Sequence, residues 1–149
     1  MGQQPKVDAR GFTLLELIVT LLVVAIAVGL VAPAIGRSTE ALRVRAEVAG
    51  FSATFRHARE RAITTRQPFT VAVNPTNHLL TVTTGEDEVR WTRALSNRLE
   101  IRAETPRALT VRFEPQGTSS GGEFHLISGK ISYRVSVDAV TGRVRNQRE

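Results

Sequence analysis

An uninterrupted apolar run near the start of the chain restricts its fold more than any other feature. Nearly every residue from Phe12 to Ile35 is apolar, and Glu16 is the only charge in that run. At 1.5 Å per residue, a helix of about 24 residues is long enough to cross a bilayer core of about 30 Å. The run is longer than the apolar part of a secretory signal peptide, and no small-x-small cleavage site closes it. We therefore predict a single membrane-spanning helix over residues 12–36.

The charges before the run predict its orientation. Residues 1–10 are polar and contain two positive residues, Lys6 and Arg10. Positive residues that flank a span stay on the cytoplasmic side of the membrane. The prediction is that the short leader is cytoplasmic and that the chain after the span lies outside the cytoplasm.

Glu16 is an unusual residue for a membrane span. A carboxylate inside a spanning helix costs roughly 2.5–3.5 kcal/mol on insertion scales, so such a residue is a candidate for a functional site. The alternative is a carboxylate near the membrane edge that is protonated or reaches the interface.

The residues around Glu16 carry a resemblance to a known family. They resemble the prepilin signature of type IV pilins and type II secretion pseudopilins: Arg10, Gly11, Phe12, Thr13, Leu14, Leu15 and Glu16. The resemblance implies that residues 1–11 are a leader peptide, which a dedicated prepilin peptidase removes by cutting between Gly11 and Phe12. It also implies N-methylation of Phe12, the first residue of the mature chain.

The same resemblance implies a role for Glu16 in assembly, because it falls at the fifth position of the mature chain. Cleavage creates a cationic amine at the start of the apolar helix, and stacked helices in a filament bring that amine to the glutamate of a neighbour. Two opposite charges in a low dielectric attract strongly, and either one alone is costly. The pair is therefore expected to set the register of the filament.

A second apolar pattern follows the predicted span. Its apolar members recur at steps of three and four residues, which places them on one face of a helix. Residues 37–66 are therefore predicted to continue the helix in amphipathic form, with Arg56 and Glu60 as an i,i+4 pair on its polar side. We interpret the stripe as a face packed on the chain's own sheet, and a coiled-coil seam is the alternative. Its members are Ala41, Val44, Val48, Phe51, Phe55, Ala58 and Ala62.

The pattern changes to alternation after Pro68. Alternating apolar and polar residues, separated by turn-forming residues, are typical of half-buried strands. One long helix followed by many antiparallel strands predicts the α+β class, with residues 67–149 as an antiparallel β domain. The predicted strands are 69–73, 79–83, 89–93, 99–102, 108–113, 123–127 and 131–137, with Val144 in a last short strand.

Further motifs in the β domain narrow the resemblance. They look like those of the H-type minor pseudopilins of type II secretion and of related minor pilins of the FimT/FimU kind, all of which have the pilin-like fold. The matching residues are Phe113, Pro115, Gly117, Gly121, Gly122, Val135, Val137 and Thr141 to Val144.

The first functional hypothesis is structural. The resemblance implies a minor pseudopilin of a type II secretion system, which helps to assemble the tip of a periplasmic pseudopilus and to export folded proteins. Its expected location is the bacterial inner membrane as a single-pass protein with a periplasmic domain. The expected partners are other major and minor pseudopilins, the prepilin peptidase and the inner-membrane assembly platform.

The alternative hypothesis is a minor type IV pilin that assists pilus assembly and binds DNA during uptake. Some minor pilins of this group carry a Gly-Arg-x-Arg segment linked to DNA binding, and Gly142, Arg143 and Arg145 match it. Arginines two residues apart on an extended segment point to the same side, so both reach one phosphate backbone, and Arg148 adds a third contact. The net charge of +6 fits this hypothesis, although only two of the twenty basic residues are lysine.

No catalytic constellation is present in the sequence. The chain has no cysteine, so it has neither a disulfide nor a thiolate nucleophile. Its three histidines, His57, His78 and His125, have no ligand-like spacing, and no Gly-x-Ser-x-Gly motif occurs. We expect no catalytic residue, no metal and no cofactor, and we predict that the protein is not an enzyme.

Overall fold

The computed structural model describes residues 12–85, 88–104 and 109–149, and for residues 31–38 it describes only the backbone. The chain divides into two compact units, Met1–Glu40 and Ala41–Glu149. Gly11 and the rest of the predicted leader lie outside the described residues.

A single long helix, α1, runs from Leu14 to Thr65. Its first turn is capped by Thr13, whose carbonyl accepts a hydrogen bond from Leu17 N at 3.1 Å and whose Oγ1 accepts one from Glu16 N at 3.2 Å. The residue after Thr65, Arg66, has a φ of 55°, the left-handed conformation that commonly ends a helix.

From Leu14 to Leu30, the side chains of α1 are exposed all round. Every residue from Phe12 to Leu30 is exposed. The large apolar residues in this range keep more than half of their surface exposed, except Val19, which is 49% exposed. Among the residues whose side chains are described, no helix meets the length and hydropathy of a membrane span. The predicted span over 12–36 extends into residues 31–38, whose side chains are outside that description.

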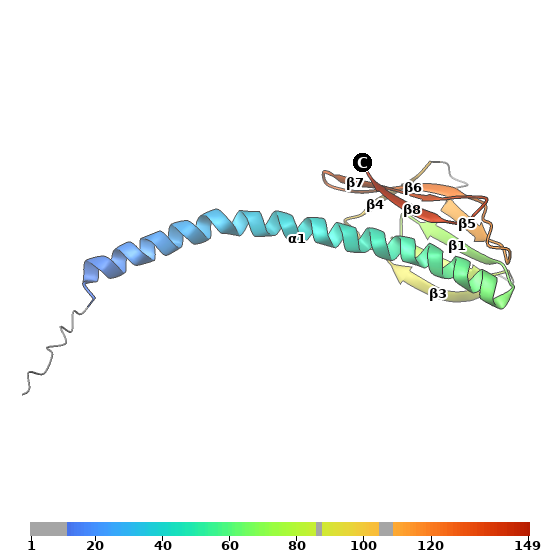
Figure 1. The fold of residues 1–149 in the computed structure, drawn as a ribbon, viewed down its shortest axis with the longest axis horizontal. Coiled ribbons are helices and arrows are strands. Elements are labelled where there is room, and N and C mark those ends of the chain that lie inside the picture. The colour runs from blue at the N-terminus through green and yellow to red at the C-terminus, as the bar shows by residue number, and fades with distance from the viewer. Residues whose placement is uncertain (1–11, 86–87, 105–108) are drawn as a thin grey trace, which may run out of the picture. The chain divides into compact units, whose positions relative to one another are not determined.

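The described residues of the second unit form two four-stranded antiparallel sheets, shown in Figure 1. The first sheet has the order β3-β2-β1-β5, with β1 at Phe69–Asn74, β2 at Leu79–Thr84, β3 at Val89–Ala94 and β5 at Thr110–Phe113. The second has the order β4-β6-β7-β8, with β4 at Glu100–Ala103, β6 at Gly122–Ser128, β7 at Ile131–Val137 and β8 at Val144–Arg148.

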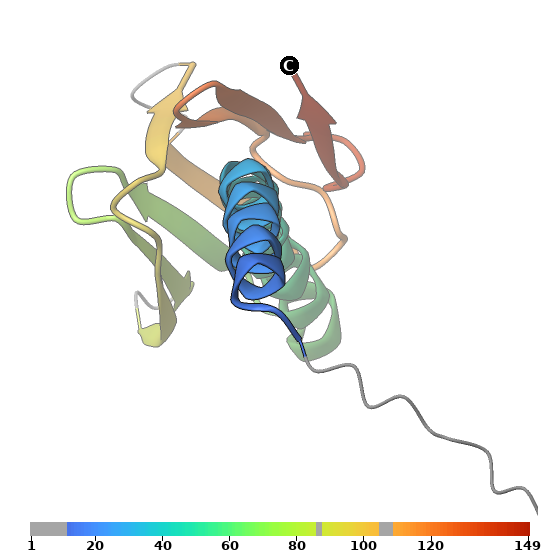
Figure 2. The same cartoon turned by 90° about the vertical axis from the view of Figure 1, so that its left-hand side faces the viewer.

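The core lies between the second half of α1 and both sheets. The predicted helical stripe is confirmed as a packing face, because six of its seven members are buried and Ala41 is half-buried. Phe51 and Phe55 pack on Phe124 of β6 with ring centroids 5.3 Å apart in each pair, an ordinary aromatic contact distance. β3 and β8 lie on opposite sides of this part of the helix (Figures 1 and 2).

The predicted strands are confirmed, with shifts at their ends, and residue 108 of the predicted strand 108–113 lies outside the described residues. The last strand is longer than predicted, since β8 covers five residues of which Val144 is only the first. It is almost wholly polar, and its inner face meets α1 through a hydrogen bond of 2.6 Å from Ser52 Oγ to Asn146 Oδ1. The predicted pair of Arg56 with Glu60 is wrong, because Arg56 instead donates to the carbonyl of Val144 at 3.4 Å.

Candidate functional site

The predicted processing site lies where the described residues begin, at Phe12. Phe12 is 81% exposed, and Gly11 is outside the described residues. Thr13 and Glu16 have a local role that our reading of the sequence missed, although a Thr followed three residues later by Glu is a known helix-start pattern. Glu16 also lies in the first turn, where the helix dipole favours a negative charge. Among the described residues, its carboxylate has no hydrogen-bond or ion-pair partner.

The C-terminal Gly-Arg-x-Arg segment begins with a glycine that the fold requires. Gly142 is buried at a φ of 62°, and a Cβ added there would lie 2.3 Å from the carbonyl oxygen of Gly117. The same carbonyl accepts a hydrogen bond of 3.1 Å from Arg59 Nε on α1. We name Arg59, Gly117 and Gly142 the glycine clasp. It joins the helix to two loops, so Gly142 has a structural role.

The three C-terminal arginines do not share one face. Neighbouring residues on a strand point to opposite faces, and Asn146 points toward α1. Arg148, two residues further, therefore points to the helix side, whereas Arg145 points to the outer side of the sheet. Arg143 and Arg145 do lie together, because both line the same grooves. The structure brings two of the three predicted residues to one place.

One of these grooves has mixed charge. It has a volume of about 700 Å³ and lies beside the turn between β7 and β8. Arg143 and Arg145 line it together with three carboxylates, those of Glu104, Glu123 and Asp138. A polyanion that binds to these arginines therefore also meets three negative charges, which weakens the case for a nucleic-acid site.

Asp138 organises the turn that carries these arginines. Its carboxylate accepts hydrogen bonds from the backbone N–H and the hydroxyl of Thr141, both at 2.7 Å. These two bonds lower the pKa of Asp138, and the charge of Arg145 lowers it further. The turn is thus held with its carboxylate ionised.

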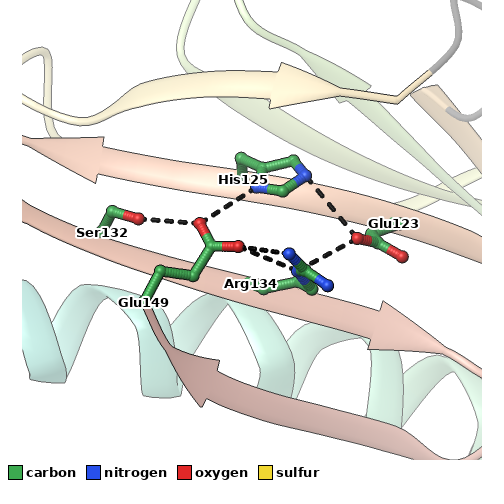
Figure 3. A network of polar contacts seen from close by, with 5 residues as sticks. All are labelled: Glu123, His125, Ser132, Arg134 and Glu149. Atoms are coloured by element: carbon green, nitrogen blue, oxygen red, sulfur yellow. Dashed lines mark hydrogen bonds and ion pairs between the residues drawn. The ribbon is translucent and has the colours of Figure 1, made fainter.

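A second polar cluster lies on the outer face of the same sheet (Figure 3). The Glu149 carboxylate accepts hydrogen bonds from Ser132 at 2.8 Å and from Arg134 at 2.6 Å, and it contacts His125 Nδ1 at 3.2 Å. Arg134 also pairs with Glu123 at 3.1 Å. The bond from Ser132, then those from Arg134 and His125, lower the pKa of Glu149 to about 2. This cluster ties β6, β7 and the end of β8 together.

The histidines do not form a metal site. His57 is exposed and packs edge-on against Trp91, with ring centroids 4.8 Å apart. His78 follows the turn between β1 and β2, and His125 lies on the outer sheet face. Across residues 12–85, 88–104 and 109–149, no three His, Asp or Glu side chains are grouped so that they would hold a metal ion.

Comparison with known families decides the identity of the fold. Residues 47–142, more than half of the chain, match the family described as type II transport protein GspH. The chain belongs to the GspH family. Residues 7–32 also match the prokaryotic N-terminal methylation motif, which covers the predicted cleavage site.

Individual relatives agree with this assignment. Type II secretion system protein H of Xanthomonas campestris pv. campestris is 28% identical over 144 residues, covering 92% of this chain and 82% of that protein. Two solved structures share the fold. The minor pseudopilin EpsH of Vibrio cholerae has a TM-score of 0.58 at 15% identity, covering 70% of this chain and 96% of that one. The type IV minor pilin FimU of Pseudomonas aeruginosa has a TM-score of 0.61 at 14% identity, covering 73% and 91%.

As a GspH-family member, the chain is a minor pseudopilin of type II secretion, with a pilin-like α+β fold. It is a structural subunit of a membrane-anchored pseudopilus, which contains other pseudopilins, and it is not an enzyme.

Proposed function

We propose that this chain enters the periplasmic pseudopilus through the first half of α1 and helps to assemble the tip of that filament for export of folded proteins. The observation that carries the proposal is the continuous exposed apolar surface from Phe12 to Leu30, which contains one acid, Glu16. An apolar surface of this extent is stable only in lipid or against other apolar surfaces. Before assembly the partner is the inner membrane, crossed once by residues 12–36, and after assembly it is the helices of other pseudopilins.

Processing precedes assembly in this proposal. The prepilin peptidase removes residues 1–11 by cutting between Gly11 and Phe12, and Phe12 is then methylated. Phe12 is highly exposed ahead of the first turn of α1, which suits access by the peptidase. The new amine on Phe12 meets Glu16 of a neighbouring subunit, and that carboxylate is free for it because it has no partner among the described residues of its own chain. The inner-membrane assembly platform supplies the incoming subunits, and residues 67–149 remain in the periplasm.

Cleavage and secretion test this proposal together. The full chain, or its Gly11→Val variant, is expressed in its own host after deletion of the native gene. We expect the wild type to have methylated Phe12 as its first residue by mass spectrometry and to restore secretion, whereas Gly11→Val stays uncleaved and does not. Gly29→Ala is the matched control for cleavage, since it is a Gly substitution away from the cleavage site and a Cβ at Gly29 meets nothing within 4 Å in this chain. Cleavage elsewhere, or secretion supported by the uncleaved variant, would contradict the proposal.

A further inference from the structure

Four arginines gather where the second half of α1 passes the edge strand β8. They surround a groove of about 250 Å³, and its lining contains no carboxylate. Two of them come from the helix, Arg143 comes from the segment that leads into β8, and Arg145 comes from β8 itself. The lining residues are Arg56, Arg59, Gly142, Arg143, Val144 and Arg145.

These four arginines differ from others in the same fold. Elsewhere on the two sheets, arginine side chains pair with acids at 2.6–3.0 Å, as in Arg90–Glu88, Arg102–Glu100, Arg112–Glu114 and Arg134–Glu149. Within the described part of the chain, none of the four groove arginines forms such an ion pair. Arg56 and Arg59 instead donate to the neutral carbonyls of Val144 and Gly117. The charges of Arg56, Arg59 and Arg143 are therefore available to a partner outside the chain, whereas the charge of Arg145 also acts on Asp138.

We propose that this four-arginine groove binds the carboxylates of an acidic segment on a neighbouring pseudopilin. The inference rests on the proposed function, because assembly into a filament brings a second subunit to this surface. A guanidinium presents a planar fork of donors that matches a carboxylate, and such charge-assisted pairs are among the stronger hydrogen bonds. The groove is small enough for one or two Asp or Glu side chains rather than for a long ligand.

The surroundings of the groove favour a protein over a nucleic acid. Arg143 and Arg145 also border the larger groove, which contains Glu104, Glu123 and Asp138. A phosphate backbone that runs along both grooves is repelled by these three carboxylates. A protein segment avoids the repulsion by presenting acids to the four arginines and basic or neutral residues to the acidic side, which is the usual form of charge matching between proteins.

Site-specific photo-crosslinking in the host tests the proposal with the full chain. Benzoylphenylalanine replaces Val140, which is 77% exposed in the turn that leads to the groove. The matched control replaces Val89, which is 56% exposed on β3. We expect Val140, and not Val89, to capture another pseudopilin of the same system at a peptide that contains Asp or Glu. No capture of a pseudopilin at Val140, or capture at a peptide without acids, overturns the proposal.

Charge removal supplies the second readout. The double variant Arg143→Gln, Arg145→Gln lowers the Val140 crosslink yield about tenfold, as expected when two charged contacts are lost. The variant Arg90→Gln, Arg102→Gln removes the same charge from the sheets and leaves the yield unchanged. Urea unfolding of each variant checks that the fold is retained. An equal loss of crosslink yield in both double variants overturns the proposal, because the loss would then follow from the lower net charge rather than from the groove.

Two further measurements separate this proposal from its rivals. Fluorescence anisotropy of the detergent-solubilised full chain with a labelled DNA duplex asks whether nucleic acid is the partner. Micromolar binding that Arg143→Gln, Arg145→Gln abolishes overturns the protein assignment, and no such binding supports it. Secretion by the wild-type chain in the deletion strain reports the proposed function independently. If secretion is restored but Val140 captures no pseudopilin, only the groove proposal fails.

Discussion

The two halves of α1 have the same backbone conformation and opposite surroundings. In the first half, from Leu14 to Leu30, apolar residues occur all round the helix and all are exposed. In the second half, from Val44 to Ala62, the large apolar residues follow one stripe and are buried against the two sheets. The first half is therefore adapted to partners outside the chain, and the second half to partners within it.

The comparison shows that the spacing of apolar residues, rather than their number, determines where their partner lies. A stripe leaves a polar side for water, so one covering layer of the chain's own sheets is enough. A helix that is apolar all round needs cover on every side, which lipid or a bundle of other helices supplies. Thr13 and Glu16 begin the outward half, and the glycine clasp on Arg59 secures the inward half.

The largest predicted difference between the halves concerns core packing. Phe124→Ala removes the ring that packs on Phe51 and Phe55, so we expect the free energy of unfolding to fall by about 3–5 kcal/mol. Leu22→Ala, in the outward half, should change it by less than about 0.5 kcal/mol. Urea unfolding of the full chain in detergent measures both. A large loss for Leu22→Ala would mean that the outward half has a partner within the chain.

The glycine clasp gives the next largest effect. Gly142→Ala places a Cβ against the carbonyl of Gly117 at a left-handed φ, so we expect a loss of about 3 kcal/mol in unfolding free energy. Gly129→Ala is the matched control, since it has a similar φ of 57° and open space around the added Cβ. It should cost about 1 kcal/mol. Equal losses of unfolding free energy in the two variants would show that close packing at Gly142 does not contribute to stability.

A smaller effect is predicted for single hydroxyls on the two halves. Ser52→Ala removes the donor to Asn146 of β8, and leaving that buried contact unmade should cost about 1 kcal/mol. Thr20→Ala removes an exposed hydroxyl that, among the described residues, bonds to the carbonyl of Leu17 in its own helix. Thermal unfolding should separate the two variants, and indistinguishable melting temperatures would contradict the inward role of Ser52.

The smallest effect concerns the polar cluster on the outer face of the second sheet. The pKa of Glu149 is about 2 in the folded chain, below its ordinary value of 4.5. Its ionised form therefore stabilises the fold above about pH 4.5, and this contribution is lost as the pH falls toward 2. Glu149→Gln should flatten that part of the stability profile measured by unfolding between pH 5 and pH 2. Glu60→Gln, on the exposed side of α1, is the control, and an equally steep profile for Glu149→Gln would contradict the assignment.

The sequence predicted those parts of the fold in which local periodicity and packing agree. The stripe from Val44 to Ala62 and the alternating strands were readable because buried positions recur at fixed steps. β8 was underestimated, because a polar edge strand has no such pattern and is held by its pairing with β7 and by the bond from Ser52, 94 positions earlier, to Asn146. The glycine clasp and the four-arginine groove likewise join residues far apart in the chain, which no local pattern reports.

The candidate site residues also differ in how well the sequence predicted them. Gly11, Phe12 and Glu16 were predicted from a short contiguous motif, and their proposed partners are a peptidase and a neighbouring subunit rather than this chain. Arg143 and Arg145 were predicted to act together, and the structure places them on shared grooves. The structure also shows two features that the spacing of the arginines did not predict. Arg148 faces the other side of β8, and acids border one of the grooves.

Secretion by a Glu16→Gln variant tests most directly the claim that the outward half of α1 serves assembly. The variant keeps the side-chain shape and the Thr13 cap but removes the charge that is proposed to meet a neighbour's amine. In the deletion strain, we expect Glu16→Gln to be cleaved and folded like the wild type yet to lose secretion, whereas Glu60→Gln, on the inward half, secretes normally. Wild-type secretion by Glu16→Gln would contradict the account.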